Sequence, residues 1–320
     1  MAVFTNVAEG DLRRFLQDYA IGSLCSYRGI VEGVQNSNFL LHTQAGRFIL
    51  TLYENGVEKH DLPFFLGLTQ HLNERGVVCP WPISRKDGSI VGELAGRPAA
   101  IISFLEGSWT PKPLLNHCAQ VGAMLARLHL AARDFPLTRE NALSLTNWQE
   151  LWDNCRARAD EVQSGWQKDI GAELVFLKAH WPQGLPSGVI HADLFIDNVF
   201  FQADHIVGVI DFYFACNDAW AYDIAVCLNA WCFEADGVYN RQKARALIEN
   251  YCKVRSLEAE EKAFLPVLVR GASMRFLLTR LYDWFHTPHG RLVVKKDPRE
   301  YWQKLSFFRK ACQDDLGLWP

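Results

Sequence analysis

Three polar residues follow one another in the stretch 189–215, and their types suit phosphoryl transfer. Asp193 lies two residues after His191, Asn198 comes five residues later, and Asp211 ends a second apolar run. In such a reaction one carboxylate orients and deprotonates a hydroxyl, while an amide and a second carboxylate hold magnesium on the nucleotide phosphates. The order therefore predicts Asp193 as the catalytic base and Asn198 and Asp211 as metal ligands, with ATP and Mg²⁺ as cofactors.

Two short strands must position these residues. Apolar runs at 199–201 and 206–210 lie on either side of a turn, and the spacing from His191 to Asn198 is H-x-D-x-x-x-x-N, the pattern of a kinase catalytic loop. We interpret His191 as a brace of the loop that moves no proton. A purely structural interpretation makes His191 a packed loop residue and the acids turn or strand-end residues. The strand–loop–strand context of the complete motif favours the catalytic interpretation over this structural one.

The composition indicates a soluble enzyme. The chain has 320 residues, 49% of them apolar and 22% charged, with a net charge of −3, which is long enough for two lobes. This balance argues against a nucleic-acid partner. No run reaches the roughly 18 apolar residues of a membrane helix, and the N-terminus lacks a signal pattern, so we expect a cytoplasmic protein without a membrane partner. Nine scattered cysteines without a CxxC pair predict free thiols rather than a zinc site.

The pattern along the chain changes from strands to helices near Gly107. Strands are predicted at 27–31, 39–43, 47–53, 90–94 and 97–105, with one helix at 58–74 in which Pro63 either lies in the first turn or kinks the helix. Helices are predicted at 114–132, 148–162, 171–180, 219–232, 241–254 and 260–285. The sequence therefore predicts an α+β bilobal fold. Residues 1–105 form a nucleotide-binding lobe with a hinge from Ser103, and 106–320 a catalytic and acceptor-binding lobe.

Three segments, HADLFIDN, IDFYFA and DAWAYDIA, resemble the aminoglycoside phosphotransferase/choline kinase group of protein-kinase-like small-molecule kinases. The resemblance implies that Asp223, in the third segment, is a buried aspartate that braces the catalytic loop. Longer segments between residues 27 and 284 are similar to bacterial homoserine kinases of the kinase-like type: EGVQNSNFLLHTQAGRFILTLYE, DLPFFLGLTQHL, RPAAIISFLEG and RFLLTRLYDW. This second resemblance implies homoserine as the small-molecule substrate and a place in threonine biosynthesis.

The predicted nucleotide side departs from most kinases. Where their third strand carries a lysine, the matching strand RFILTLYE has Thr51, which offers a hydroxyl but no charge. Thr51 is equally well explained as an ordinary strand residue. Arg47, Lys59 or magnesium are the candidates to replace the missing charge.

A full glycine-rich loop is absent as well, since only Gly29 and Gly33 remain before Gln35 and the polar stretch Asn36, Ser37 and Asn38. Short polar residues at a hairpin tip offer donors to phosphate, although any solvated turn contains them too. The resemblance favours nucleotide contact. For the adenine we predict backbone groups at the end of the last strand, at Ser103, Phe104 and Leu105.

An amino-acid acceptor requires a donor for its carboxylate. Arg275 and Arg280 lie on an otherwise apolar helical segment, and we predict them in this role in that order. The alternative for Arg280 is a structural ion pair with Asp283, three residues later. Tyr213 and Trp220 are predicted to wall the acceptor pocket, although aromatic side chains there also suit plain packing.

Other functions share parts of this pattern. A pseudokinase that binds ATP without turnover is suggested by the missing lysine, but the intact acid, amide and acid argue against it. A metal-dependent hydrolase would use His191 and Asp193 and requires further ligands, for which His180 and His205 are the nearest histidines. A kinase of the same fold for choline, methylthioribose or an aminoglycoside is compatible with the spacing.

Overall fold

The structure is a computed structural model that describes residues 5–30, 36–54, 58–287, 295–312 and 314–318. It divides into two compact units: residues 1–107 with 207–213, and residues 108–206 with 214–320. The predicted α+β class with a strand-rich and a helical part is confirmed. The division follows Gly107, two residues after the predicted boundary. The segment 207–213, predicted in the C-terminal lobe, belongs to the first unit.

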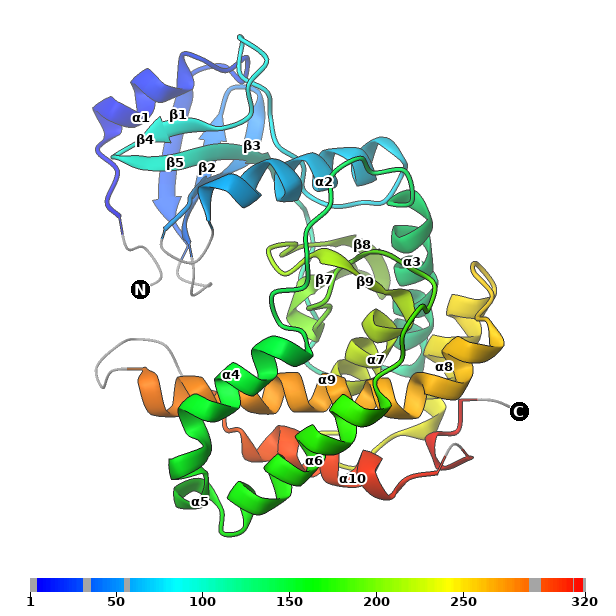
Figure 1. Cartoon of the computed structure of the whole chain (residues 1–320). Coiled ribbons are helices and arrows are strands. Elements are labelled where there is room, and N and C mark those ends of the chain that lie inside the picture. The colour runs from blue at the N-terminus through cyan, green and yellow to red at the C-terminus, as the bar shows by residue number, and fades with distance from the viewer. Residues whose placement is uncertain (1–4, 31–35, 55–57, 288–294, 313, 319–320) are drawn as a thin grey trace. The chain divides into compact units, whose positions relative to one another are not determined.

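An antiparallel five-stranded sheet forms the body of the first unit (Figure 1). Its order is β1-β2-β3-β5-β4, so β3 lies in the middle and pairs with β2 and β5. Aliphatic side chains of β2, β3 and β5, among them Leu41, Leu50 and Ile101, are fully buried in its core. The strands are β1 (Leu24–Gly29), β2 (Ser37–Thr43), β3 (Gly46–Leu52), β4 (Gly92–Leu94) and β5 (Arg97–Ser103).

Two helices accompany this sheet. Helix α2 (Leu62–Glu74) follows the 3-10 turn η1 (Lys59–Asp61), and Pro63 lies in its first turn, the first of the two predicted alternatives. Helix α1 (Glu9–Leu16), which the sequence analysis missed, buries Leu12, Phe15 and Leu16 in the same core as the sheet. Its eight residues are too few for a clear helical period, which explains the omission.

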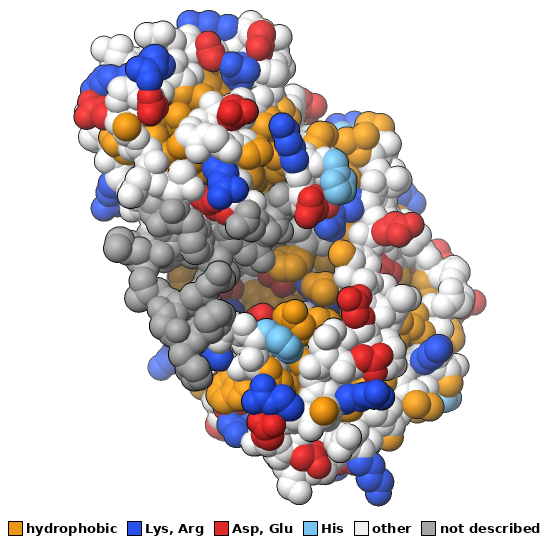
Figure 2. Space-filling model, turned by 60° about the vertical axis from the view of Figure 1, so that its left-hand side comes forward, with side chains coloured by type: hydrophobic (Ala, Val, Ile, Leu, Met, Phe, Trp, Pro, Cys, Tyr) orange, Lys and Arg blue, Asp and Glu red, His pale blue; other side chains and the backbone are white. Residues whose placement is uncertain are grey.

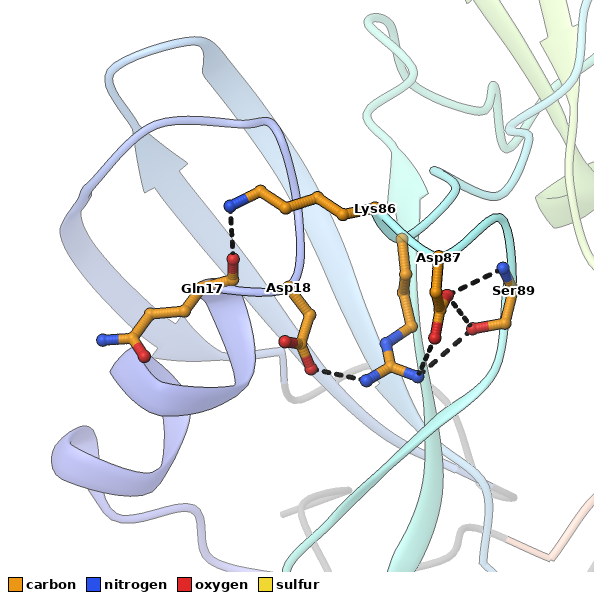
Figure 3. Close-up of polar contacts among 6 residues, drawn as sticks. Gln17, Asp18, Lys86, Asp87 and Ser89 are labelled. Carbon is orange, nitrogen blue, oxygen red and sulfur yellow. Dashed lines mark hydrogen bonds and ion pairs between the residues drawn. The ribbon is translucent and has the colours of Figure 1, made fainter.

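Polar contacts fasten the end of α1 to the turn at 85–89 (Figure 3). Lys86 Nζ donates to the carbonyl oxygen of Gln17 at 2.6 Å, and Arg85 forms an ion pair with Asp18. Asp87 accepts from the backbone N–H of Ser89 at 2.9 Å, which closes the turn. Hydrogen bonds and an ion pair thus connect the end of α1 to the turn at 85–89.

Helices dominate the second unit. The long helix α9 (Ala259–His286) packs against α4, α6, α7 and α10, while α3 packs against α8 (Figure 1). The predicted helix at 148–162 is broken into three pieces, and α10 was not predicted. The other elements are α3 (Leu115–Ala131), α4 (Leu145–Cys155), η2 (Arg156–Arg158), α5 (Ala159–Val162), α6 (Trp166–His180), α7 (Trp220–Trp231), α8 (Arg241–Cys252), α10 (Arg299–Lys310) and η4 (Asp314–Leu316).

Short strands deliver the predicted catalytic residues. Strand β6 (Ser187–Ile190) pairs antiparallel with β9 (Cys216–Ala219) and ends immediately before His191. The 3-10 turn η3 (Ile196–Asn198) leads into β7 (Val199–Gln202), and the boundary between the units falls within β8 (His205–Val209). In this way one strand end fixes the start of the catalytic loop and η3 fixes its end.

The surface and the thiols agree with the composition. Acidic and basic side chains are interspersed on the face seen in Figure 2. All nine cysteines are free thiols, as predicted. Among the described helices, none combines the length and the apolar character needed to cross a membrane.

Candidate active site

The loop between β6 and β7 has a fixed and partly strained backbone. Ala192 adopts a left-handed conformation with φ of +62°, which costs a residue other than glycine about 1–3 kcal/mol. The N–H of Phe195 donates to the Asp193 carbonyl oxygen at 2.8 Å. Asn198 Nδ2 donates to the same carbonyl at 2.8 Å, so the side chain of the predicted amide holds the backbone of the predicted base.

Asp223 holds this loop from the side of α7. Its carboxylate is fully buried and accepts from the N–H of His191 at 2.8 Å and from the N–H of Ala192 at 2.9 Å. The structure therefore gives Asp223 the contacts that the predicted bracing role requires. His191 is also fully buried, and its Nδ1 lies 3.3 Å from the N–H of Asp193, so the ring packs inside the loop.

A buried chain behind Asp223 escaped the sequence analysis. His129 Nε2 lies 3.0 Å from the Asp223 carboxylate, and its Nδ1 lies 2.8 Å from the Tyr251 hydroxyl. Arg255 donates to the same hydroxyl at 3.1 Å and to Glu261 at 2.9 Å. The only sequence signal was a histidine between Leu128 and Leu130 on an apolar helix, which by itself fits ordinary packing.

Burial and hydrogen bonds set the protonation states in this chain. Burial lowers the pKa of His129 below its usual value, against the opposing effect of Asp223. Burial raises the pKa of Asp223, but the hydrogen bonds from His129 and from the N–H of His191 outweigh it and hold the pKa below its usual value. The carboxylate therefore stays ionised and can accept all three hydrogen bonds.

Both predicted acceptor arginines have protein partners. Arg275 is only 1% exposed; it donates to the Ala192 carbonyl, and its Nη2 lies 3.7 Å from the Asp193 carboxylate. Arg280 pairs with Glu300 at 2.6 Å, so the alternative of an Arg280–Asp283 pair is wrong. Glu300 lies in the first turn of α10, a helix that the sequence did not predict.

Thr51 belongs to a neutral polar cluster in the first unit. Its hydroxyl donates to Asn38 Oδ1 at 2.9 Å, directly across the β2–β3 pair, and contacts the Tyr213 hydroxyl. The Tyr213 hydroxyl lies 3.5 Å from that of Tyr53, and burial raises the pKa of Tyr213 to about 12. We call Asn38, Thr51, Tyr53 and Tyr213 the strand cluster. It contains no charge, and Arg47 is instead paired with Glu106.

The start of β2 also makes polar contacts within the first unit. Ser37 donates to Glu54 at 2.7 Å, and the N–H of Glu54 donates to Asn36 Oδ1 at 3.3 Å. The side chains of Asn36 and Ser37 are buried. Gly33 and Gln35, from the same predicted turn, lie outside the described residues. Lys59 is exposed in η1.

A small pocket of about 70 Å³ lies in the first unit beside the predicted magnesium aspartate. Asp211 is exposed and adopts a left-handed conformation with φ of +64°. The pocket is lined by Phe65, Leu66, Thr69, Pro80, Ile102, Ile210, Asp211, Phe212 and Tyr213. Aromatic contacts of Tyr213 with Tyr53 and Phe65 place its ring in the wall of this pocket.

The predicted adenine segment requires one correction. Ser103 is the last residue of β5, and its N–H donates to the Trp81 carbonyl at 2.9 Å. The expectation that the N–H of Ser103 is free for adenine is therefore wrong. The sequence contains no pattern that indicates this pairing with residue 81. Phe104 and Leu105 follow the strand. Trp220, the second predicted wall residue, is buried on α7 and stacks on His129.

Comparison with known proteins agrees with this geometry. A family model described as "Phosphotransferase enzyme family" matches residues 26–257. The chain belongs to this family. It is 61% identical to a homoserine kinase of Rhizobium etli, over 99% of this chain and 100% of that protein.

Solved phosphotransferases share the fold at low sequence identity. Spectinomycin phosphotransferase in complex with ADP and spectinomycin has a TM-score of 0.68, with 13% identity and 98% of each chain covered. A microcompartment-associated aminopropanol kinase has a TM-score of 0.63, with 17% identity, covering 97% of this chain and 99% of that one. The protein-kinase-like fold is thereby confirmed, as the sequence predicted.

The donor atoms of this phosphotransferase suit a hard cation. In the second unit Asn198 Nδ2 is used by the Asp193 carbonyl, so the Asn198 amide oxygen is the atom left to ligate; in the first unit Asp211 has an exposed carboxylate. Mg²⁺ prefers such oxygen ligands. Among the described residues, no group of three histidine, cysteine or acidic side chains is placed to hold a metal ion. The ligand set that the hydrolase alternative requires is thus not assembled there.

Proposed function

We propose that this protein is an ATP-dependent kinase that transfers the γ-phosphoryl group of ATP to the hydroxyl of L-homoserine, giving O-phospho-L-homoserine and ADP. The observation that carries the proposal is 61% identity with a homoserine kinase over the whole length of both proteins. The braced loop around Asp193 supports the same chemistry. In this role the enzyme would act in the cytoplasm on a small molecule, on the route to threonine.

Asp193 is the proposed base that accepts the proton of the homoserine hydroxyl. Its side chain is 18% exposed, so it is accessible to an acceptor, while its backbone is held by Asn198 and by the loop itself. Positioned general bases of this kind contribute about 10²–10⁴-fold to turnover. His191 and Asp223 act as braces, since neither is exposed.

Asn198 and Asp211 are the proposed ligands of Mg²⁺, which when bound neutralises charge on the nucleotide phosphates. For the nucleotide itself we propose Phe104 and Leu105 as backbone partners of adenine. The strand cluster, with the neighbouring Asn36 and Ser37, would face the phosphates. These neutral groups would act through hydrogen bonds where other kinases use a lysine.

The acceptor requires partners for an ammonium and a carboxylate. We propose Tyr213 and Trp220 as candidate wall residues and Arg280, which is partly exposed on α9, as the candidate carboxylate partner. Arg275 is the other predicted partner, and its contacts support a different role that is argued below. One pocket that recognises both charged groups distinguishes homoserine from simple amino alcohols.

Acceptor-dependent ADP release tests this proposal. L-Homoserine is compared with 3-amino-1-propanol, which lacks the carboxylate, and with choline, methylthioribose and aminoglycosides. We expect homoserine to have at least a tenfold higher kcat/KM than 3-amino-1-propanol, about 1.4 kcal/mol, because the amino alcohol lacks the carboxylate that Arg280 would bind. Equal activity on these two acceptors would defeat the amino-acid pocket. Turnover with none of them would indicate a pseudokinase.

A further inference from the structure

Arg275 occupies an unusual place for a charged side chain. It lies in the middle of α9, is 1% exposed, and its guanidinium lies 4.5 Å from the ring centre of Phe276 and 5.4 Å from that of Phe214. A buried guanidinium is costly unless oxygen atoms compensate it. Its partners therefore show what the side chain is for.

Two of its polar partners belong to the catalytic loop, and the Tyr222 hydroxyl on α7 also interacts with its guanidinium. Nη1 donates to the Ala192 carbonyl oxygen, and Nη2 lies 3.7 Å from the Asp193 carboxylate. Asp193 is the only acid within ion-pair distance of Arg275 among the described residues. The guanidinium thus contacts the proposed base and the peptide group immediately before it.

Asp223 holds the same loop through the opposite kind of group. Its carboxylate accepts the N–H groups of His191 and Ala192, while Arg275 takes the Ala192 carbonyl. The left-handed Ala192 is therefore held on its N–H side by an anion and on its carbonyl side by a cation. We call Asp223, Arg275 and the backbone of Ala192 the loop clamp. Fixing both peptide groups of this residue fixes the direction in which the next side chain, Asp193, leaves the backbone.

We propose that Arg275 is a positioning residue for the base Asp193, acting together with Asp223, and does not bind the acceptor carboxylate. This inference rests on the proposed function for the identity of the base and of the acceptor. A misplacement of about 1 Å costs on the order of 10²-fold in rate, so the role should appear in kcat. A carboxylate ligand would instead affect KM and acceptor preference.

The experiment compares Arg275→Met, which keeps the length but removes the charge, with Arg275→Lys. Arg270 offers a matched control on the same helix, since it is also largely buried and makes two 2.7 Å contacts to Glu173. For Arg275→Met we expect kcat per folded enzyme to fall about 100-fold, with KM for homoserine and for ATP within about threefold. The preference for homoserine over 3-amino-1-propanol should be unchanged, and Arg275→Lys should restore part of kcat. Arg270→Met should lose stability and keep kcat.

Two results would overturn the inference. A large rise in the KM for homoserine with loss of the carboxylate preference would make Arg275 an acceptor ligand. An unchanged kcat per folded enzyme in both Arg275 variants would make it purely structural.

A stability measurement separates this inference from the proposed function, because it needs no acceptor. Urea midpoints are compared for Asp193→Asn, Arg275→Met and the double variant. If the two charges are partners, the double variant should lose less than the sum of the single losses. Additive losses would refute the pairing even in an active homoserine kinase. Conversely, a wild-type protein inactive on homoserine would refute the function and leave this test intact.

Discussion

The strand cluster and the loop clamp solve the problem of burying polar groups in different ways. In the first unit Thr51 and Asn38 share a neutral hydrogen bond across the β2–β3 pair, and the hydroxyls of Tyr53 and Tyr213 share another. In the second unit the loop is held by a buried carboxylate and a buried guanidinium. A neutral hydrogen bond contributes about 0.5–1.5 kcal/mol net, whereas removing one partner of a buried ion pair costs about 3–5 kcal/mol. Charge is concentrated where a backbone conformation must be enforced.

The largest expected effect concerns the base itself. Asp193→Asn keeps the shape of the side chain but cannot accept a proton, so turnover should fall about 10²–10⁴-fold while ATP affinity is retained. Steady-state kinetics and nucleotide titration measure the two quantities. Asp197→Asn is the matched control, because Asp197 is an exposed acid of the same loop. If Asp193→Asn retained more than a tenth of the turnover, the assignment of the base would fail.

The next effect concerns the anion of the loop clamp. Asp223→Ala leaves three buried donors without their acceptor, those of His191, Ala192 and His129. We expect a loss of about 3–5 kcal/mol in the free energy of unfolding of the second unit, measured by urea denaturation.

Asp218→Ala provides the comparison for this variant. Asp218 is only half-buried and accepts from Asn141 and from the N–H of Ala219. Its loss should cost about 1 kcal/mol per hydrogen bond. Equal losses in the two variants would mean that the clamp has no special energetic weight.

The two regions also differ in how far the sequence predicted them. The catalytic loop has a fixed spacing over eight residues, so local sequence was sufficient to predict Asp193 and Asn198 together. Its supports come from distant segments: His129 is 94 residues from Asp223, and Arg275 is 83 residues from Ala192. No period or spacing connects such pairs. Long helices and strands were found because their apolar residues repeat regularly, whereas the short α1 gives too few repeats.

The grouping of the segment 207–213 shows the same limit. The sequence placed Asp211 in the C-terminal lobe because it follows the catalytic loop along the chain. The structure groups it with the first unit, where the N–H of Val209 donates to the Val78 carbonyl at 3.0 Å. This contact joins residues 131 positions apart. The position of a segment along the chain therefore does not show with which unit it packs, and this is known only from the three-dimensional structure.

The smallest expected effect concerns the strand cluster. Thr51→Val keeps the shape of a residue that is 3% exposed and removes the hydroxyl that donates to Asn38. We expect a loss of about 1 kcal/mol in stability and a rise in the KM for ATP of about fivefold or less, because only a neutral group is removed. Thr43→Val is the control on the same sheet, since the Thr43 hydroxyl donates to the Ile21 carbonyl at 2.6 Å and has no proposed nucleotide contact. It should lower stability by a similar amount and leave the KM for ATP unchanged. A hundredfold loss of kcat/KM for ATP in Thr51→Val would show that this hydroxyl replaces the missing lysine in full. The contrast between a neutral nucleotide side and a charged catalytic loop would then no longer describe how the enzyme distributes its binding energy.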